Sequence, residues 1–219
     1  MKQRKIYNHS IHNYWKLFTK KPLPIFKDWL AKEKFFLRRN IKKNSKVLDV
    51  GCGIGKHIKL LANTAKEISG VDFDKNVVEE AKKNLSRFKN VKIFFEDAQK
   101  LHFKSNVFDF IICMGNSFGD FGKNTSGVLK EMKRTIKPNG KIIISVYSEK
   151  ALEMRKRQYK KIGIKIKKVD LDGTVYTEDK LALQQFSKVK LNNIFKKVGL
   201  SVNIVELNPV SYICEAVKK

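Results

Sequence analysis

The chain has 219 residues, of which 42% are hydrophobic and 11% aromatic. This length is enough for one sizeable core but too short for two full domains with linkers, so residues 1–219 are expected to form a single domain. The sequence contains no apolar run approaching the ~18 residues of a transmembrane helix, and its basic N-terminus lacks the apolar stretch of a signal peptide. These features exclude a transmembrane helix and favour a cytoplasmic protein.

The charge of the chain is its one unusual feature of composition. Lysine and arginine number 47 against 21 aspartate and glutamate, which gives a formal net charge of +26. A field of this sign attracts phosphate-rich ligands, so a nucleic acid partner stays open as an interpretation. The lysines are nevertheless spread along the whole chain in pairs, as on solvated faces, and such charge does not define a site. A lysine-rich proteome would produce the same bias.

The cysteines and histidines give no sign of a metal site. Cys52, Cys113 and Cys214 lack metal-ligand spacing, and an odd number cannot form a complete disulfide framework. The four histidines form no helical i, i+4 pair and no cluster with the cysteines. We therefore expect no metal and three buried free thiols. The sequence does not indicate an oligomeric state.

Residues 1–45 precede the first predicted strand and are expected to form two helices separated by prolines. Apolar residues at helical spacing in the second helix indicate an amphipathic cover over a sheet. The region also contains more aromatic residues than such a cover requires, among them Tyr7, Tyr14 and Trp15. The region is therefore expected to act as a lid over a site.

Residues 46–57, with the sequence KVLDVGCGIGKH, combine a short apolar run with three alternating glycines. Asp49 places a carboxylate near the carboxyl end of a strand that is buried on both faces. Gly51, Gly53 and Gly55 leave no Cβ in the way, so backbone N–H groups can approach a ligand. The spacing differs from the dinucleotide pattern G-x-G-x-x-G, and the preceding acid favours a ligand with a cationic or amino group near the turn.

Strands and helices alternate after this turn, which predicts right-handed βαβ units and a parallel sheet. Asp72 ends the second strand about twenty residues after the turn, where an acid can accept both hydroxyls of a ribose. Asp74 directly precedes the next helix and suits an N-cap. The predicted strands cover residues 47–50, 67–71, 91–95, 108–113, 141–147, 164–169, 174–177, 181–186, 201–207 and 210–217. The predicted helices cover residues 11–18, 23–37 or 24–37, 56–63, 75–88, 127–136, 149–161 and 191–198.

These motifs together resemble the class I S-adenosylmethionine-dependent methyltransferases. The first motif of that family is hydrophobic-hydrophobic-Asp-x-Gly-x-Gly-x-Gly, and the next motifs match GVDFD at 70–74, EDA at 96–98, FDFIICMGNS at 108–117 and IKPNGK at 136–141. The resemblance implies an α/β fold, a three-layer Rossmann-like sandwich with a seven-stranded, mostly parallel sheet whose last strand is antiparallel. It divides the chain into the N-terminal lid (1–45), a cofactor-binding core (46–147), and a substrate-side insertion with closing strands (148–219).

The resemblance also implies S-adenosylmethionine as the cofactor and S-adenosylhomocysteine as the product. Asp49 would lie near the methionine amino group and the sulfonium, Asp72 would hold the ribose, and Asp97 the adenine amino group. The implied cofactor-binding residues are Asp49, Gly51, Cys52, Gly53, Gly55, Asp72, Phe73, Asp97, Ala98, Cys113, Met114 and Gly115.

For the acceptor, residues 115–118 (GNSF) resemble a loop of the glycine N-methyltransferase-like enzymes, although Asp120 stands where a His is commonly found. This resemblance implies Tyr7, Tyr14 and Asn116 as catalytic residues and a small molecule as the acceptor. The chain lacks the Asn-Pro-Pro-Tyr or Asp-Pro-Pro-Tyr motif that accepts base amino groups in many nucleic-acid methylases. No general base is identifiable.

Two alternatives stay open. The first is an RNA methyltransferase acting on tRNA or rRNA, which the charge supports and the missing amino-methylation motif opposes. The second is a non-catalytic protein that binds S-adenosylmethionine, which the intact first motif, Asp72 and Asp97 oppose.

Overall fold

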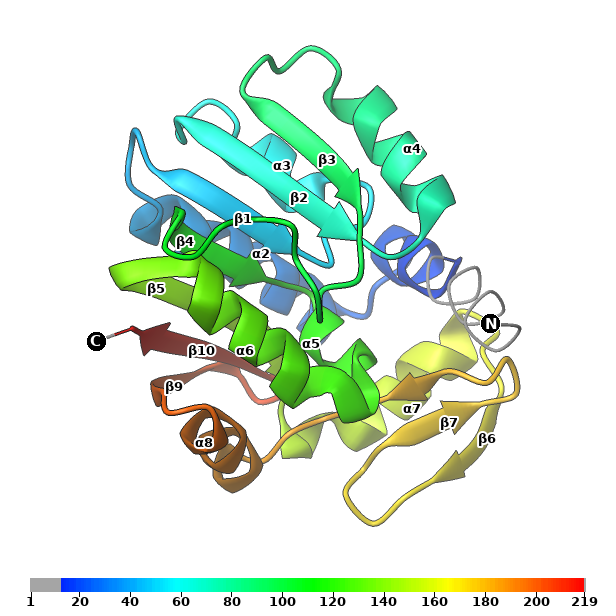
Figure 1. Cartoon of the computed structure of the whole chain (residues 1–219). Coiled ribbons are helices and arrows are strands. Elements are labelled where there is room, and N and C mark those ends of the chain that lie inside the picture. The colour runs from blue at the N-terminus through cyan, green and yellow to red at the C-terminus, as the bar shows by residue number, and fades with distance from the viewer. Residues whose placement is uncertain (1–12, 219) are drawn as a thin grey trace.

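The structure is a computed structural model that describes residues 13–218, except for the side chain of Lys123. Within this part of the chain the strands form a seven-stranded sheet in the order β3-β2-β1-β4-β5-β10-β9 and a three-stranded sheet in the order β6-β7-β8 (Figure 1). The large sheet consists of β1 (Lys46–Val50), β2 (Glu67–Asp72), β3 (Val91–Phe95), β4 (Phe108–Cys113), β5 (Ile136–Tyr147), β9 (Ser201–Asn208) and β10 (Ser211–Val217). The small sheet consists of β6 (Ile166–Val169), β7 (Val175–Thr177) and β8 (Ala182–Leu183).

Strands β1 to β5 pair in parallel, and β10 runs antiparallel to both of its neighbours, β5 and β9. Helices cover both faces of the parallel strands, so most residues of β1 and β4 are buried and apolar. The predicted Rossmann-like sandwich with a mostly parallel sheet and an antiparallel last strand is therefore confirmed.

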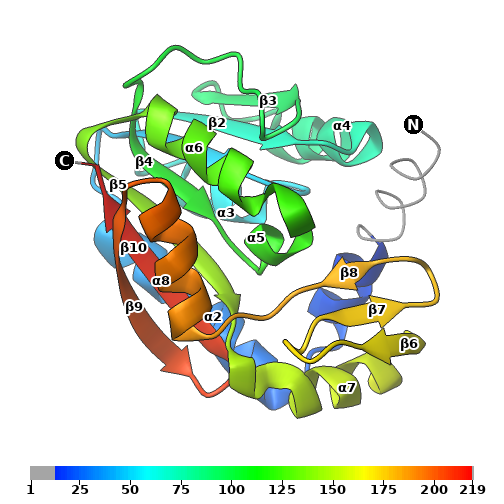
Figure 2. The same ribbon diagram turned by 60° about the horizontal axis from the view of Figure 1, so that its bottom comes forward.

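The helices form one layer on each face of the large sheet, and Figures 1 and 2 show α2 and α3 on the side opposite to α6 and α8. Val47 packs with residues of α2, α3 and α4, whereas its neighbour Leu48 packs with residues of α6 and α8, as the two-residue period of a strand requires. Residues 13–20 are also helical. The remaining helices are α2 (Pro24–Asn40), α3 (Lys56–Leu61), α4 (Lys75–Leu85), α5 (Ser117–Asp120), α6 (Thr125–Thr135), α7 (Leu152–Lys161) and α8 (Lys188–Lys197).

Element ends follow local chemistry in most places. Asp74 caps α4 by accepting from the backbone N–H groups of Asn76 and Val77, as its position predicts. Several predicted boundaries are wrong by a few residues: α8 begins at Lys188 instead of residue 191, and β8 is only Ala182–Leu183. The largest difference is at β5, which begins at Ile136 and includes Pro138, Asn139 and Gly140, the residues left between the predicted helix 127–136 and strand 141–147. The register of β5 on β4 shifts at this point, so the turn residues form an irregularity inside the strand instead of a stop.

The two faces of the large sheet each carry a core cluster, and a third core cluster joins the N-terminal helices to the small sheet. Tyr14 and Phe18 pack with α2, the end of β5, α7 and the small sheet, and both aromatic residues are buried. Figure 2 shows the small sheet beside residues 13–20 and above α7. This cluster holds the N-terminal helices and the small sheet at one end of the large sheet. A site can form between them and the ends of the strands.

The rest of the described chain adds three findings. Within residues 13–218, no helix is long and apolar enough to cross a membrane. In the same range, no group of three His, Cys, Asp or Glu residues could hold a metal ion. The three cysteines are buried and free, as predicted.

Candidate active site

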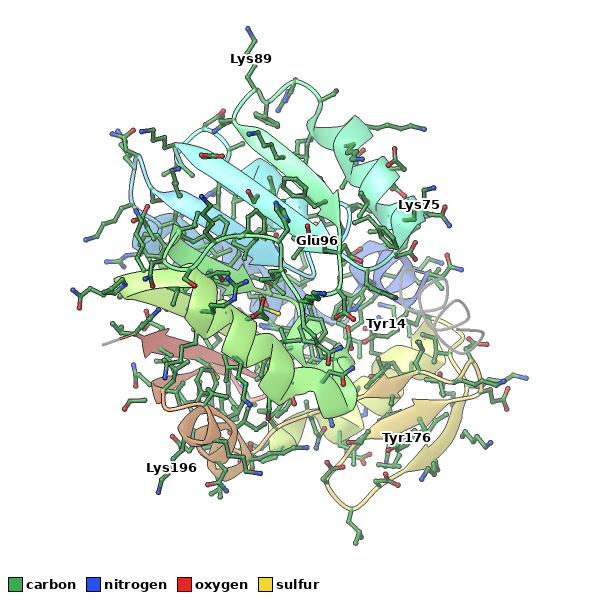
Figure 3. The ribbon with its side chains drawn as sticks, in the orientation of Figure 1. Tyr14, Lys75, Lys89, Glu96, Tyr176 and Lys196 are labelled. Carbon is green, nitrogen blue, oxygen red and sulfur yellow. The ribbon has the colours of Figure 1, made fainter. Side chains whose placement is uncertain are left out.

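A cavity of about 860 Å³ lies at the carboxyl ends of the parallel strands, in contact with both sheets. The loops after β1, β2, β3 and β4 line one side, and residues of the N-terminal helix and of the small sheet line the other. Figure 3 labels Glu96, just after β3, and Tyr176, on β7, which both line it. This is the edge at which open parallel sheets bind their ligands.

Glycines in the loops after β1 and β4 leave room for a ligand. Gly53 and Gly115 line the cavity at φ values of +53° and +62°, and a Cβ added to either would meet no atom within 4 Å. Gly55 differs, because a Cβ there would come within 2.4 Å of the Leu85 side chain. Gly53 and Gly115 therefore keep space open in the cavity, whereas Gly55 allows the turn to pack on α4.

Asp72 holds the glycine turn in place. Its Oδ2 accepts from the backbone N–H of Gly53 at 2.9 Å, and its Oδ1 accepts from the backbone N–H of Asp74 at 3.0 Å. Desolvation raises the pKa of Asp72 above its ordinary value, although these hydrogen bonds oppose the shift. The carboxylate lines the cavity and can accept further hydrogen bonds there.

A group of buried charges lies beside the turn. Glu33 accepts from the backbone N–H of Gly115 through Oε1 at 3.1 Å, and its Oε2 lies 3.6 Å from Nε2 of His57. Asp49 is buried, and its Oδ2 has no hydrogen-bond partner within residues 13–218. Desolvation raises the pKa of Asp49 to about 7. Desolvation would lower the pKa of His57, but Glu33 and Asp49 outweigh it and raise that pKa, so this region favours a cation.

Asp120 stands at the end of α5, on the same cavity. Its Oδ2 accepts from Nε1 of Trp15 at 3.2 Å, which joins the N-terminal helix to the loop after β4. Burial of the carboxyl raises the pKa of Asp120 to about 8, against the hydrogen bond from Trp15 and the charge of Arg155. An acid with this pKa can change its protonation state near neutral pH.

The structure places the residues that the sequence singled out in two groups. The cavity is lined by Gly51, Cys52, Gly53, Asp72, Phe73, Asp97, Ala98, Met114 and Gly115. Five others, which are buried or packed behind it, are not among the described residues that line it: Tyr14, Asp49, Gly55, Cys113 and Asn116. Tyr7 lies outside the described residues.

Tyr14 and Asn116 are engaged within the protein. The hydroxyls of Tyr14 and Tyr147 lie 3.0 Å apart, inside the third core cluster. Asn116 accepts from the backbone N–H of Tyr147 at 3.0 Å and donates to the carbonyl of Gln184 at 3.3 Å. Both side chains thus tie the end of β5 to a wall of the cavity.

The sequence analysis did not identify Glu33 and His57 as site residues. It also did not identify Thr174, Tyr176 and Gln184, which line the cavity from the small sheet or next to it. Glu33 carries a signal in the sequence, since it falls on the helical stripe of the apolar residues Phe26, Trp29 and Leu37. Such a charge on a buried stripe needs a polar partner. The residues of the small sheet carry no comparable signal.

The family described as methyltransferase domain matches residues 41–199 of this chain. The chain belongs to this family. The methyltransferase domain is similar to a protein of known crystal structure from Pyrococcus horikoshii OT3, with a TM-score of 0.73 and 26% identity over 90% of this chain and 93% of that chain.

Two further relatives have named activities. Demethylmenaquinone methyltransferase of Staphylococcus aureus is 32% identical over 125 residues, which are 54% of this chain and 50% of that protein. The chain thus spans about half the length of the curated relatives it matches. The 1,6-didemethyltoxoflavin-N1-methyltransferase of Burkholderia thailandensis, crystallised with S-adenosylhomocysteine, has a TM-score of 0.69 at 13% identity over 97% of this chain and 89% of that chain. At this identity the likeness shows the fold alone.

The fold and the family are those of the class I S-adenosylmethionine-dependent methyltransferases, so S-adenosylmethionine is the cofactor. Features of this structure fit that molecule. The open space at Gly53 and Gly115 admits a ligand against the backbone, and the half-buried Asp72 offers a carboxylate to hydroxyl groups. Asp49 is buried beside the glycine turn, and its Oδ2 has no hydrogen-bond partner within residues 13–218, so its charge favours a ligand with positive charge nearby.

Proposed function

We propose that this chain transfers the methyl group of S-adenosylmethionine to a small-molecule acceptor. One observation carries the proposal. The cavity extends from the strand ends, where the cofactor would bind, to the small sheet and the N-terminal helix, so it offers a second region for an acceptor. Its volume of about 860 Å³ lies within the range of about 300–1,000 Å³ of small-molecule sites. It can therefore hold a cofactor and a small acceptor together.

The cofactor side would be formed by the nine predicted residues that line the cavity. Asp72 would accept the ribose hydroxyls, Asp97 the adenine amino group, and Phe73 would lie near the adenine. Asp49 would favour the positive charge of the ligand from behind the glycine turn, since it is buried next to it. Gly55 and Cys113 would support the same turn and strand through packing.

S-adenosylmethionine, when bound, supplies a methyl group on a positively charged sulfur, which is already an activated leaving group. The chain has to align the acceptor with that methyl group and exclude water. Trp15, Phe121 and Tyr176 contribute aromatic surface to the cavity, which lowers its water content. The hydrogen bond from the backbone N–H of Gly115 to Glu33 would hold the loop after β4 in place during the transfer.

The residues on the acceptor side of the cavity favour a small-molecule acceptor, as in the glycine N-methyltransferase-like enzymes. The GNSF loop places Asn116 where it fixes Gln184, a residue that lines the cavity. Tyr14 and Asn116 would act there as positioning residues through Tyr147. The names of two similar proteins give demethylmenaquinone and 1,6-didemethyltoxoflavin as their acceptors, which supports a small-molecule acceptor over a nucleic acid.

A transfer assay with S-adenosylmethionine labelled in its methyl group tests this proposal. The label is offered with the small-molecule fraction of a cell extract and, separately, with bulk RNA. We expect transfer to the small-molecule fraction, and none with Gly53→Ala, whose added Cβ would project into the cavity. Transfer to RNA alone would contradict the acceptor class, and the absence of S-adenosylhomocysteine binding would contradict the activity itself.

A further inference from the structure

Asp120 lies where the two sides of the cavity meet. It ends α5, the short helix after β4, and it lines the cavity together with Ser117 of the same helix. Ser117 also packs against the glycine turn, since a Cβ on Gly51 would come within 2.9 Å of its Cβ. From the other side, Trp15 donates its indole N–H to Oδ2 of Asp120 at 3.2 Å. The carboxyl therefore lies between the glycine turn and the N-terminal helix.

In the described part of the chain, the surroundings of Asp120 include a cation that stays charged, Arg155. Arg155 is fully buried, with its guanidinium 4.7 Å from the ring centre of Tyr147 and its N–H groups bonded to Tyr159, Gln185 and backbone carbonyls. Within residues 13–218, the charged and titratable groups that act on Asp120 include Asp72 from β2, Cys113 from β4, Tyr147 from β5 and Arg155 from α7.

We propose that Asp120 is a catalytic residue that accepts the proton that the acceptor loses when it is methylated. The inference rests on the proposed function and deepens it, because it defines the class of acceptor. The position of Asp120 on the cavity, its hydrogen bond to Trp15 and the fixed cation behind it carry the proposal.

The step balances without any further reactant. A bond forms between the acceptor's nitrogen or oxygen and the methyl carbon, and the bond from this carbon to sulfur breaks with its electron pair left on the sulfur. The proton of the acceptor's N–H or O–H passes to the carboxylate of Asp120. One positive and one negative charge thus disappear together, which is favoured in a site with little water.

This step predicts the acceptor class. The acceptor carries a neutral N–H or O–H group, since a proton must be available for Asp120. Trp15, Phe121 and Tyr176 line the same cavity as Asp120, so a flat, mostly apolar molecule fits there. An acceptor atom without a proton, such as a tertiary amine or a thioether, would leave Asp120 without a role.

Proton counting during ligand binding tests this role without an identified acceptor. With its pKa of about 8, about 0.9 of Asp120 is protonated at pH 7 in the free protein. The sulfonium charge of S-adenosylmethionine favours the ionised carboxylate, whereas S-adenosylhomocysteine has no such charge. Both ligands carry the same amino group, so the difference between them isolates the effect of the sulfonium.

Calorimetric titrations with the two ligands, in buffers of different ionisation enthalpy, measure this difference. We expect S-adenosylmethionine to release about 0.5–0.9 more protons than S-adenosylhomocysteine at pH 7. The difference should fall by at least about 0.3 proton in Asp120→Asn. Asp49→Asn measures the share of the other buried acid that titrates near neutrality. If Asp120→Asn does not fold, the wild-type difference should fall close to zero at pH 9.5, where Asp120 is ionised in both complexes.

A difference below about 0.3 proton at pH 7, or one that Asp120→Asn retains, overturns the inference, because a carboxyl that stays protonated beside the sulfonium cannot accept a proton. Failure of both ligands to bind is a separate result. It would contradict the proposed function and not the role of Asp120 alone.

Discussion

Replacing Asp72 by alanine is expected to weaken binding of S-adenosylhomocysteine about 10- to 150-fold. The carboxylate faces the cavity, where we place the ribose, and it also accepts from the backbone N–H of Gly53. Loss of charge-assisted hydrogen bonds of this kind costs about 1.5–3 kcal/mol, which converts to that range of affinity at 1.36 kcal/mol per factor of ten. The folded state should persist, because Asp72 is half-buried at the edge of the sheet.

Asp74→Ala is the matched control, since Asp74 lies two residues away and also lines the cavity. Its side chain caps α4 by accepting from the backbone N–H groups of Asn76 and Val77. Loss of such a cap costs about 0.5–2 kcal/mol of stability. The control should therefore lower the free energy of unfolding and change ligand affinity by less than about threefold.

Isothermal titration calorimetry gives the affinities, and urea denaturation of the ligand-free proteins gives the free energies of unfolding. The two variants should separate, with Asp72→Ala affecting affinity and Asp74→Ala affecting stability. The reverse order would refute the assignment of Asp72 to the cofactor.

Three other perturbations follow from the same geometry. Gly53→Ala should abolish cofactor binding in a folded protein, whereas Gly55→Ala should lower stability through the clash with Leu85, as calorimetry and thermal melting will show. Tyr14→Ala should cost about 3–5 kcal/mol in urea denaturation, the usual loss for a buried aromatic residue; a change below about 1 kcal/mol would mean that the N-terminal helix is not part of the core. Asp49 has a native pKa of about 7, above its unfolded value of about 3.9, so the native state binds the extra proton and its stability falls as pH rises from about 4 to about 7. The free energy of unfolding of Asp49→Asn should therefore rise relative to that of the wild type between about pH 4 and about pH 7. An equal difference between the two proteins at both pH values would contradict the shifted pKa.

The parallel sheet could be predicted because its determinants are local. The apolar run at Val47 to Val50, the glycine turn and the capping Asp74 each act within a few residues, and the structure has the predicted strand and helix at each point. The alternation of strands and helices then favours parallel pairing with right-handed connections. The cofactor side of the cavity depends on the same turns, which is why nine of its predicted residues lie on it.

The acceptor side depends on contacts between distant segments. Tyr14 meets Tyr147 across 133 positions, and Trp15 meets Asp120 across 105. No periodicity in the sequence indicates that Tyr14 faces the core while its neighbour Trp15 faces the cavity. The expected lid is thus anchored by buried aromatic residues in its described part, and its opening stays a prediction.

Hydrogen exchange with and without S-adenosylhomocysteine tests the central claim most directly, since it shows where the ligand binds. We expect added protection in residues 51–57, 72–74, 97–99 and 114–117, which form the cofactor side of the cavity, and in residues 13–20 if the lid closes. The amides of β9 and α8 should not change and provide the internal control. No change at millimolar ligand, or a change confined to the separate pocket around residues 170–173 and 185–190, would contradict the placement of the cofactor at the strand ends.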